Sequence, residues 1–445
     1  MKIETFLDYN AIVAGQCFPV HLAVRFAAPE FRSGRTQPIA FGLVIDRSGS
    51  MGGRPLEGAK AAAKVVASNL RKDDLLAITV FDDQAHVALP LQPVRSAEAV
   101  KSLIEDIQTG GGTNLTAGWS LCRDELRNAP ANTPRRLLLL SDGLLNIGIT
   151  EPLQVGQIVS QGLELDGTRS SCLGFGNGYD EDLLADLADA TGGSFYDATD
   201  PERLPQIFAA ELDGLQRIAA QNLRLRFRHL MFCDGALQLS NYPWHEMPDG
   251  RVELAIGDLV SEEERTLVLA LDVAALPPLP EDAETNLEGE ELVELEVLWD
   301  AIGEDGIASK SWLQTVRVRA VQDLSQIKPN SEVIPWVATQ QAAWSIRGAL
   351  DAADRDQHIR ARALLNRTRL KLEAMGQHGD VQDGLNLVRE MESRLDPEDG
   401  WSIRDRKLAR YASADFSKMS SEQAFVAEDA TLAEPSYKQR RKSER

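Results

Sequence analysis

The chain has 445 residues, of which 43% are hydrophobic and 26% charged, a composition typical of soluble globular proteins. This length suggests about three domains. Its 68 acidic and 47 basic residues give a formal net charge of −21. That excess argues against non-specific binding to nucleic acid or to anionic membranes, because both require cationic patches.

We expect no targeting or membrane-spanning segment in this sequence. Residues 1–8 hold charges of both signs without the apolar core of a signal peptide, and no run of about eighteen apolar residues occurs. Four cysteines lie far apart, without the spacing of a metal site: Cys17, Cys122, Cys172 and Cys233. We expect them to be reduced thiols, mostly buried, and we expect a cytoplasmic location.

The first segment, residues 1–36, contains two stretches that alternate between apolar and polar residues, 2–6 and 18–26. Alternation of this kind predicts β-strands, but two strands are too few for an independent domain. We therefore expect them to complete a β-sandwich whose other strands come later in the chain.

Residues 37–215 alternate between apolar strands and helices of about ten to fifteen residues. The predicted strands are 39–46, 75–81, 85–89, 137–141, 170–175 and 194–196. The predicted helices are 56–70, 97–107, 115–128, 152–162, 181–190 and 201–214. This order predicts an α/β fold, a doubly wound and mainly parallel sheet with helices on both faces.

Three further segments follow. Residues 216–328 alternate at period two, as in 222–228, 267–272, 292–298 and 316–320, which predicts an antiparallel β-sandwich with the α/β domain inserted in it. Residues 329–396 form a small helical region, with helices expected at 335–353, 356–375 and 381–395. Residues 397–445 are polar, end in a basic tip (437–445), and are expected to be mostly a flexible tail, with docking to an acidic partner as the alternative.

The strand 39–46 leads into a group of oxygen-bearing side chains. Asp46, Ser48 and Ser50 follow one another at alternate positions and are succeeded by glycines. Hydroxyl and carboxylate oxygens suit a small divalent cation such as Mg²⁺. By itself the pattern fits a helix N-cap equally well, since Ser and Asp also satisfy free amide groups at helix starts.

Two distant stretches favour the metal. The glycine-rich loop 109–116 presents Thr113, and a second buried strand, 137–141, ends beside Asp142. In a parallel sheet the carboxyl ends of the strands lie at one edge, where ligands bind. The sequence therefore predicts a metal site of Asp46, Ser48, Ser50, Thr113 and Asp142.

This constellation resembles the von Willebrand factor type A domain and its metal-ion-dependent adhesion site, over roughly residues 37–215, in a protein of the bacterial cytosolic type. The resemblance implies that Ser48, Ser50 and Thr113 bind Mg²⁺ directly, with Mn²⁺ or Ca²⁺ as alternatives, while Asp46 and Asp142 often act through water. It also implies that an Asp or Glu of a partner protein completes the coordination. The residues expected to form the partner-binding rim are Arg47, Met51, Arg54, Asp82, Asn114 and Gly143.

The function expected from this resemblance is Mg²⁺-dependent protein binding by an intracellular adaptor or scaffold. Family members of this type work beside MoxR-type AAA+ ATPases or with kinases and phosphatases in stress and defence systems, and such a partner is expected here. Ligation of the metal by a second copy of the chain would instead give a homo-oligomer. No nucleic-acid partner is expected.

An enzyme is the alternative of a different class. A metal-dependent hydrolase or phosphoryl-transfer enzyme would need a general acid or base, or a second cation, beside the metal. Arg47, Arg54 and Asp82 are the nearby candidates, but the glycine-rich loop lacks the lysine of a phosphate-binding loop and the histidines form no cluster. We expect no catalytic residues and no enzyme activity.

Overall fold

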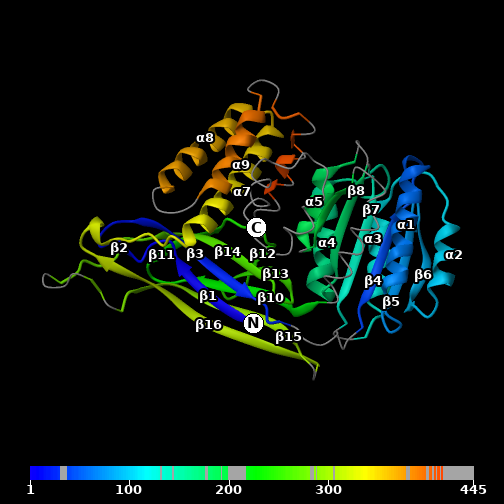
Figure 1. Ribbon diagram of the computed structural model, residues 1–445, viewed down its shortest axis with the longest axis horizontal. Helices are drawn as coiled ribbons and strands as arrows, with labels where there is room; N and C mark the ends of the chain where they lie inside the picture. The colour runs from blue at the N-terminus through cyan, green and yellow to red at the C-terminus, as the bar shows by residue number, and fades with distance from the viewer. Residues whose placement is uncertain are drawn as a thin grey trace.

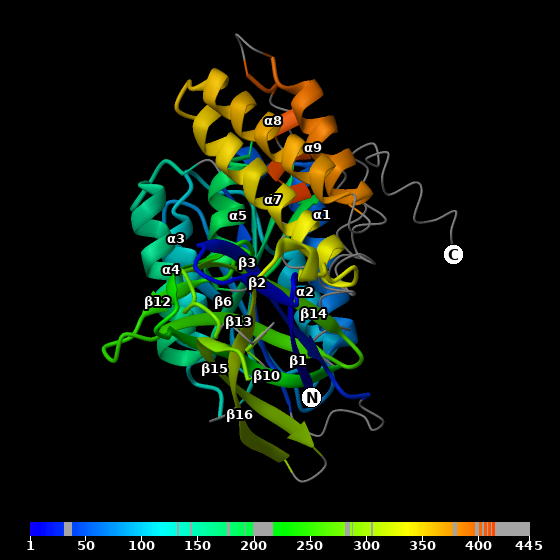
Figure 2. The ribbon, with the colours of Figure 1, turned by 90° about the vertical axis from the view of Figure 1, so that its left-hand side faces the viewer.

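The computed structural model describes 1–30, 38–130, 133–142, 145–175, 179–191, 193–198, 217–280, 285–286, 288–303, 306–376, 381–396 and short stretches up to 413. The expected helix at 201–214, the rim residue Gly143 and the tail beyond 413 lie outside these residues. Figures 1 and 2 show an α/β domain beside a β-sandwich, with helices packed on the sandwich.

The α/β domain is built on a six-stranded sheet in the order β6-β5-β4-β7-β8-β9. The strands are β4 (Ala40–Asp46), β5 (Leu75–Phe81), β6 (Ala85–Pro93), β7 (Arg135–Ser141), β8 (Arg169–Phe175) and β9 (Phe195–Ala198). All neighbours are parallel except β5 and β6, which a tight turn joins as an antiparallel hairpin. Every residue of β4 is buried, as expected for a central strand covered on both faces.

Helices cover both faces of this sheet (Figure 1). They are α1 (Arg54–Asn69), α2 (Ala97–Glu105), α3 (Leu115–Leu126), α4 (Pro152–Asp166) and α5 (Glu181–Ala190), with a 3-10 turn η1 (Gly49–Met51) before α1. One hydrophobic core lies under α1 and α2, and a second lies under α3, α4 and α5. The predicted α/β class is confirmed.

Strand β6 extends to Pro93, four residues beyond the predicted end at Leu89. This extension includes Pro90 and Pro93, and proline cannot donate a ladder hydrogen bond. The strand lies at the edge of the sheet, where one side of the backbone needs no partner and proline is tolerated.

The sandwich consists of two sheets ordered β1-β3-β14-β11 and β12-β13-β10-β15-β16-β2. The strands are β1 (Lys2–Leu7), β2 (Ala11–Val13), β3 (Phe18–Ala27), β10 (Ile218–His229), β11 (Cys233–Gln238), β12 (Trp244–Glu246), β13 (Val252–Val260), β14 (Glu264–Val273), β15 (Glu290–Gly303) and β16 (Gly306–Val321). As predicted, the N-terminal strands complete the sandwich, since β3 pairs with both β1 and β14. The short strand β2 departs from the antiparallel expectation, because it runs parallel to β16.

Three further helices pack on the sandwich and on one another: α7 (Val333–Ala353), α8 (His358–Met375) and α9 (Gln382–Arg394). Val333 and Val337 of α7 join a core with Val268 of β14, and a 3-10 turn η3 (Leu324–Gln326) precedes the helix. Helix α8 begins at His358 rather than the predicted Asp356, because Asp356 has φ = 56°, outside the right-handed helical region. None of the described helices has both the length and the apolar composition to cross a membrane.

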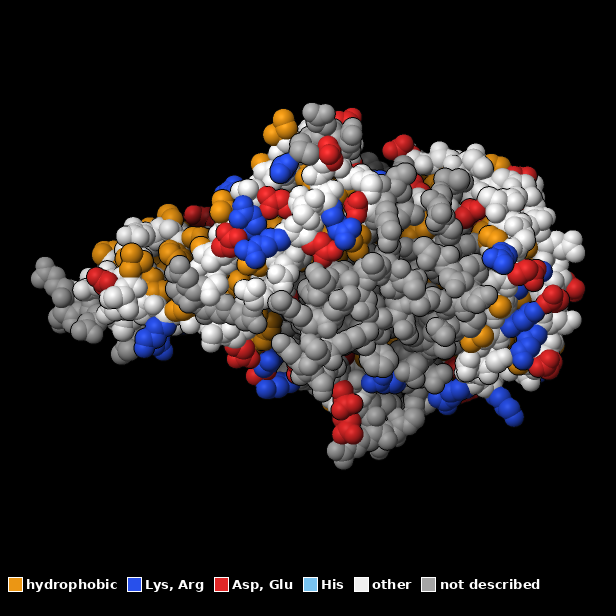
Figure 3. All heavy atoms as spheres, turned by 45° about the horizontal axis from the view of Figure 1, so that its top comes forward, with side chains coloured by type: hydrophobic (Ala, Val, Ile, Leu, Met, Phe, Trp, Pro, Cys, Tyr) orange, Lys and Arg blue, Asp and Glu red, His pale blue; other side chains and the backbone are white. Residues whose placement is uncertain are grey.

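The face that carries these helices shows acidic and basic side chains next to one another (Figure 3). Arg369 of α8, for example, forms ion pairs with Glu373 in its own helix and with Glu392 of α9. Because opposite charges are interspersed on this face, their electrostatic fields largely cancel at a distance and would not steer a charged partner toward it.

A buried ion cluster links the α/β domain to the sandwich. Asp258 of β13 lies between Arg136 at the start of β7 and Arg169 at the start of β8. Burial lowers the pKa of Arg169 well below its usual range, and repulsion from Arg136 and Arg265 adds to this effect. The cluster contacts the amino ends of the parallel strands, so the edge formed by their carboxyl ends points away from the sandwich.

Candidate metal centre

Asp46 ends strand β4 and is fully buried. Its Oδ1 accepts a hydrogen bond from the Ser48 amide at 2.8 Å, and its Oδ2 accepts one from the Ser141 hydroxyl at 2.7 Å. Burial raises the pKa of Asp46 to about 6, against the lowering effect of the Ser141 and Ser48 hydrogen bonds, and the nearby Asp142 raises it further. A buried, fixed carboxylate that resists ionisation gains most from a nearby cation.

Ser48 and Ser50 follow on the loop that leads into α1. Ser48 is buried, Ser50 is exposed, and their Oγ atoms lie 3.2 Å apart. Ser48 does occupy the N-cap position of η1, but its side chain makes no capping hydrogen bond to that turn. The capping alternative therefore does not explain the hydroxyl, which remains available to a ligand.

The glycine-rich loop 109–116 contacts the loop that carries Ser48 and Ser50. The Gly49 amide donates to the carbonyl of Gly111 at 2.8 Å, and Thr113 is buried behind it. The Thr113 amide donates to Asn146 Oδ1 at 2.7 Å, so a residue beyond β7 fixes the threonine. The sequence reasoning missed Asn146, since its role depends on a contact between segments 33 residues apart.

Asp142 follows strand β7 directly and supplies the second carboxylate. It is partly buried, and its Oδ1 atom is inaccessible to solvent yet has no hydrogen-bond partner among the described residues. A buried polar atom without a partner is unfavourable by roughly 1–3 kcal/mol. A bound cation would satisfy this oxygen.

Arg47 and Asp82 form an ion pair at the rim, with Arg47 Nη2 lying 2.7 Å from Asp82 Oδ2. The backbone of Arg47 also joins three loops, because its amide donates to Phe81 and its carbonyl accepts from Gly110. Asp82 lies in the turn after β5, where its Oδ1 accepts a hydrogen bond from the Gln84 amide. Arg47 is thus held in place by its neighbours.

The other predicted rim residues differ in how exposed their side chains are and in what those side chains contact. Arg54 is exposed at the start of α1, as a rim residue should be. The prediction for Met51 is wrong, because its side chain is fully buried in the core under α1 and cannot meet a partner. Asn114 caps α3, with its Oδ1 accepting from the Ala117 amide, so its side chain is engaged within the loop.

The structure therefore gathers four of the predicted ligands around contacting loops: Asp46, Ser48, Ser50 and Thr113. Asp142 lies beside them, close enough to raise the pKa of Asp46. Among the described residues, no three His, Cys, Asp or Glu side chains form a metal-binding group. Hard oxygen donors, an unpartnered buried carboxylate oxygen and an uncapped serine fit a small divalent cation such as Mg²⁺.

The loop geometry explains its glycines and gives a first prediction. A Cβ on Gly110 would lie 1.9 Å from Asp82 Oδ2, so Gly110→Ala must displace the loop or break the Arg47–Asp82 pair. We expect Mg²⁺ affinity, measured by calorimetric titration, to fall at least tenfold. Gly156→Ala is the matched control, since a Cβ there meets nothing within 4 Å. Unchanged affinity in Gly110→Ala would contradict this account of the loop.

Comparison with known proteins agrees with this geometry. Residues 41–144 match the family profile described as von Willebrand factor type A domain. A structure described as von Willebrand factor type A from Catenulispora acidiphila has a TM-score of 0.66 at 19% identity and covers 92% of this chain and 96% of its own. The ArnB paralog VWA2 from Sulfolobus acidocaldarius has a TM-score of 0.62 at 17% identity, covering 94% and 98%.

The relatives found by sequence match only part of this chain. The uncharacterized protein sll0103 of Synechocystis sp. is 28% identical over 290 residues, which are 62% of this chain and 68% of that protein. Bovine inter-alpha-trypsin inhibitor heavy chain H4 is 31% identical over 180 residues, 38% of this chain but only 19% of that protein. The matched profile spans β4, the serine loop, Thr113 and Asp142, and on this evidence the chain contains a von Willebrand factor type A domain.

Proposed function

We propose that this chain is a Mg²⁺-dependent protein-binding adaptor whose metal centre takes an Asp or Glu side chain of a partner. The observation that carries the proposal is the Asp142 Oδ1 atom, which is buried without a partner among the described residues, in a side chain close enough to Asp46 to raise its pKa. Von Willebrand factor type A domains are generally metal-dependent interaction modules, which supports a binding role.

The five predicted site residues would play two different roles at the metal. Ser48, Ser50 and Thr113 would hold the metal directly, while Asp46 and Asp142 would balance its charge. Hydroxyl ligands neutralise a cation less than carboxylates do, so the bound metal would offer an electrophilic position to a carboxylate oxygen. Binding by the partner would then require the metal, and we propose that the protein acts in this way in the cytoplasm.

The contacts that hold Arg47 and Asp46 in place favour a binding role over an enzymatic one. Arg47 is held by Asp82, and both oxygens of Asp46 accept hydrogen bonds. A general base or a phosphate-binding cation would have to be released from these contacts before it could act. We therefore propose no catalytic residues.

The test is capture of a partner on immobilised protein with Mg²⁺, repeated with EDTA and with Asp46→Ala plus Ser48→Ala. We expect a partner that is lost in both cases, because both remove the metal. Asp73→Ala plus Ser68→Ala is the matched control, as both residues are exposed away from the site. The captured partner should in turn lose binding when one of its own acidic residues is changed to the amide. A partner retained in EDTA and in the double variant would overturn the proposal.

A further inference from the structure

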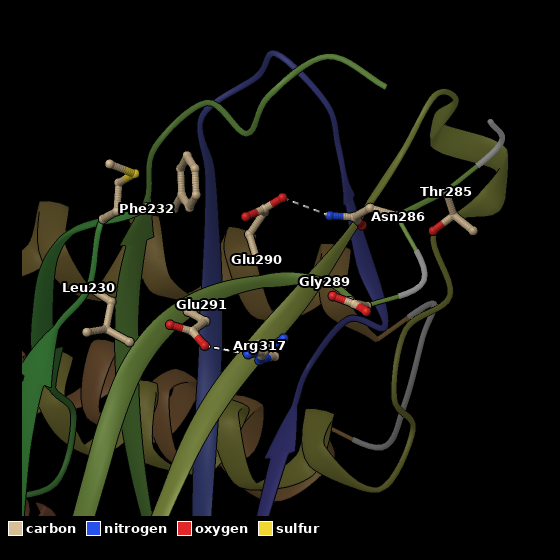
Figure 4. A pocket seen from close by; sticks show the side chains of 10 residues that line it. Leu230, Phe232, Thr285, Asn286, Gly289, Glu290, Glu291 and Arg317 are labelled. Atoms are coloured by element: carbon tan, nitrogen blue, oxygen red, sulfur yellow. Dashed lines mark hydrogen bonds and ion pairs between the residues drawn. The ribbon is translucent and has the colours of Figure 1, made fainter. Parts of the chain in front are cut away.

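A hollow of about 800 Å³ lies at one end of the sandwich, between the turn before β11 and the start of β15 (Figure 4). One wall is apolar and consists of Leu230, Met231 and Phe232. The Met231 side chain is 86% exposed, although such a large apolar side chain is usually covered. An unbranched, polarisable methionine can adapt to a range of apolar or aromatic groups.

The facing wall is acidic. Glu288, Glu290 and Glu291 line it together with one cation, Arg317 (Figure 4). Arg317 pairs with Glu291, and both side chains are nearly half exposed, so this pair is weakly held and open to exchange. Among the described residues that line the hollow, three carboxylates against one guanidinium leave excess negative charge. A suitable occupant therefore combines several cations with an apolar or aromatic group.

We propose that the basic tip of this chain, residues 437–445, docks in this hollow. Its sequence, Tyr-Lys-Gln-Arg-Arg-Lys-Ser-Glu-Arg, holds five cations against one acid and begins with an aromatic residue. The charge is opposite to that of the glutamate wall, and Tyr437 matches the apolar wall. In a chain of net charge −21, this basic segment is electrostatically complementary to the acidic hollow.

The described end of the chain lies within reach of the hollow. Arg347 of α7 donates hydrogen bonds both to the carbonyl of Ser413 and to the carbonyl of Leu239. Leu239 directly follows β11, and Phe232 directly precedes it, so the strand spans about 23 Å between them at 3.3 Å per residue. The 23 residues from 414 to 436 can extend to roughly 75 Å.

Docking within one molecule has a concentration advantage. A tethered segment meets its site at an effective concentration on the order of millimolar, so weak exposed ion pairs suffice. Because those pairs are screened, docking should weaken as salt is raised from 0.05 to about 0.5 M.

The test places the photo-crosslinker p-benzoylphenylalanine at position 437 of the full chain. Benzophenone inserts readily at methionine, so irradiation should give an intramolecular product at the peptide that contains Met231, identified by mass spectrometry. Glu288→Lys plus Glu290→Lys should lower its yield at least fivefold. Glu98→Lys plus Glu246→Lys, exposed acids outside the hollow, is the matched control and should leave it unchanged.

A second variant leaves the folded part of the chain untouched. Reversal of three tip charges, Lys438→Glu, Arg440→Glu and Arg441→Glu, should lower the same yield at least fivefold. Irradiation of an equal mixture of isotopically heavy and light protein separates links within a chain from links between chains. Products at other positions, products that join heavy and light chains, or a yield that ignores both charge reversals would each overturn the proposal.

Discussion

Replacing Asp46 with asparagine should stabilise the metal-free protein at pH 7.5 while abolishing Mg²⁺ binding. The carboxylate is fully buried, and its pKa of about 6 lies roughly two units above the ordinary value of 3.8. At 1.36 kcal/mol per unit, keeping it ionised is unfavourable by about 3 kcal/mol. Asparagine removes the charge, and its Oδ1 can still accept from the Ser48 amide. In EDTA the melting temperature should rise by roughly 5–10 °C.

The sign of this effect depends on pH. Because the folded-state pKa of Asp46 is raised, its protonation favours the folded state below the unfolded value of 3.8, and this stabilisation is lost as the pH rises to about 6. The advantage of Asp46→Asn should therefore be complete above pH 6 and shrink toward zero near pH 4. Saturating Mg²⁺ at pH 7.5 should reverse the order, since it stabilises only the wild type.

Glu98→Gln is the control for this experiment, because it makes the same change from carboxylate to amide on an exposed side chain. It should alter neither the melting temperature nor Mg²⁺ binding. If metal-free Asp46→Asn melted at a lower temperature than wild type at pH 7.5, Asp46 could not be a destabilising buried charge that a bound cation would neutralise.

The second large effect concerns the junction between the α/β domain and the sandwich. Asp258→Ala removes the carboxylate that lies between Arg136 and Arg169, all three with largely buried side chains. Removing one partner of a buried ion pair typically lowers stability by about 3–5 kcal/mol, because the remaining charge stays desolvated. We expect a loss in this range, measured by urea unfolding.

A control variant removes the charge of an exposed ion pair, so that the effect of losing a charge can be told apart from the effect of burial. Glu98→Gln breaks an exposed pair with Lys101 and should leave the unfolding midpoint unchanged. Where Asp258→Ala remains folded, its Mg²⁺ affinity should match wild type, because the metal centre lies at the opposite ends of the strands. Wild-type stability in Asp258→Ala would show that the cluster does not hold the junction together.

The parts of the site that could be predicted from sequence are those encoded locally. Asp46 ends one strand, Ser48 and Ser50 come within four residues after it, and Asp142 follows another strand, so strand ends alone place them at one edge. The role of Ser141 could have been inferred from its place beside Asp142, although only the structure shows its hydroxyl on Asp46. The likeness between residues 41–144 and the family profile reflects the same local signals.

What sequence could not supply depends on contacts between distant segments. Met51 stands next to Ser50 in the chain, but the η1 turn directs it into the core while Ser50 stays exposed. The need for glycine at position 110 arises from Asp82, which approaches from another loop. Likewise, no local pattern marks Arg136, Arg169 and Asp258 as one cluster, since β7, β8 and β13 supply one residue each.

The central claim, that these loops form a Mg²⁺ centre, is tested most directly by calorimetric titration of Mg²⁺ into wild type and Ser48→Ala plus Ser50→Ala. The account predicts one site per chain in wild type and affinity reduced at least a hundredfold in the double variant. Ser68→Ala plus Ser102→Ala, with exposed hydroxyls away from the site, should bind as wild type does. Absence of Mg²⁺ binding by wild type, or equal affinity in wild type and the Ser48/Ser50 variant, would contradict the account.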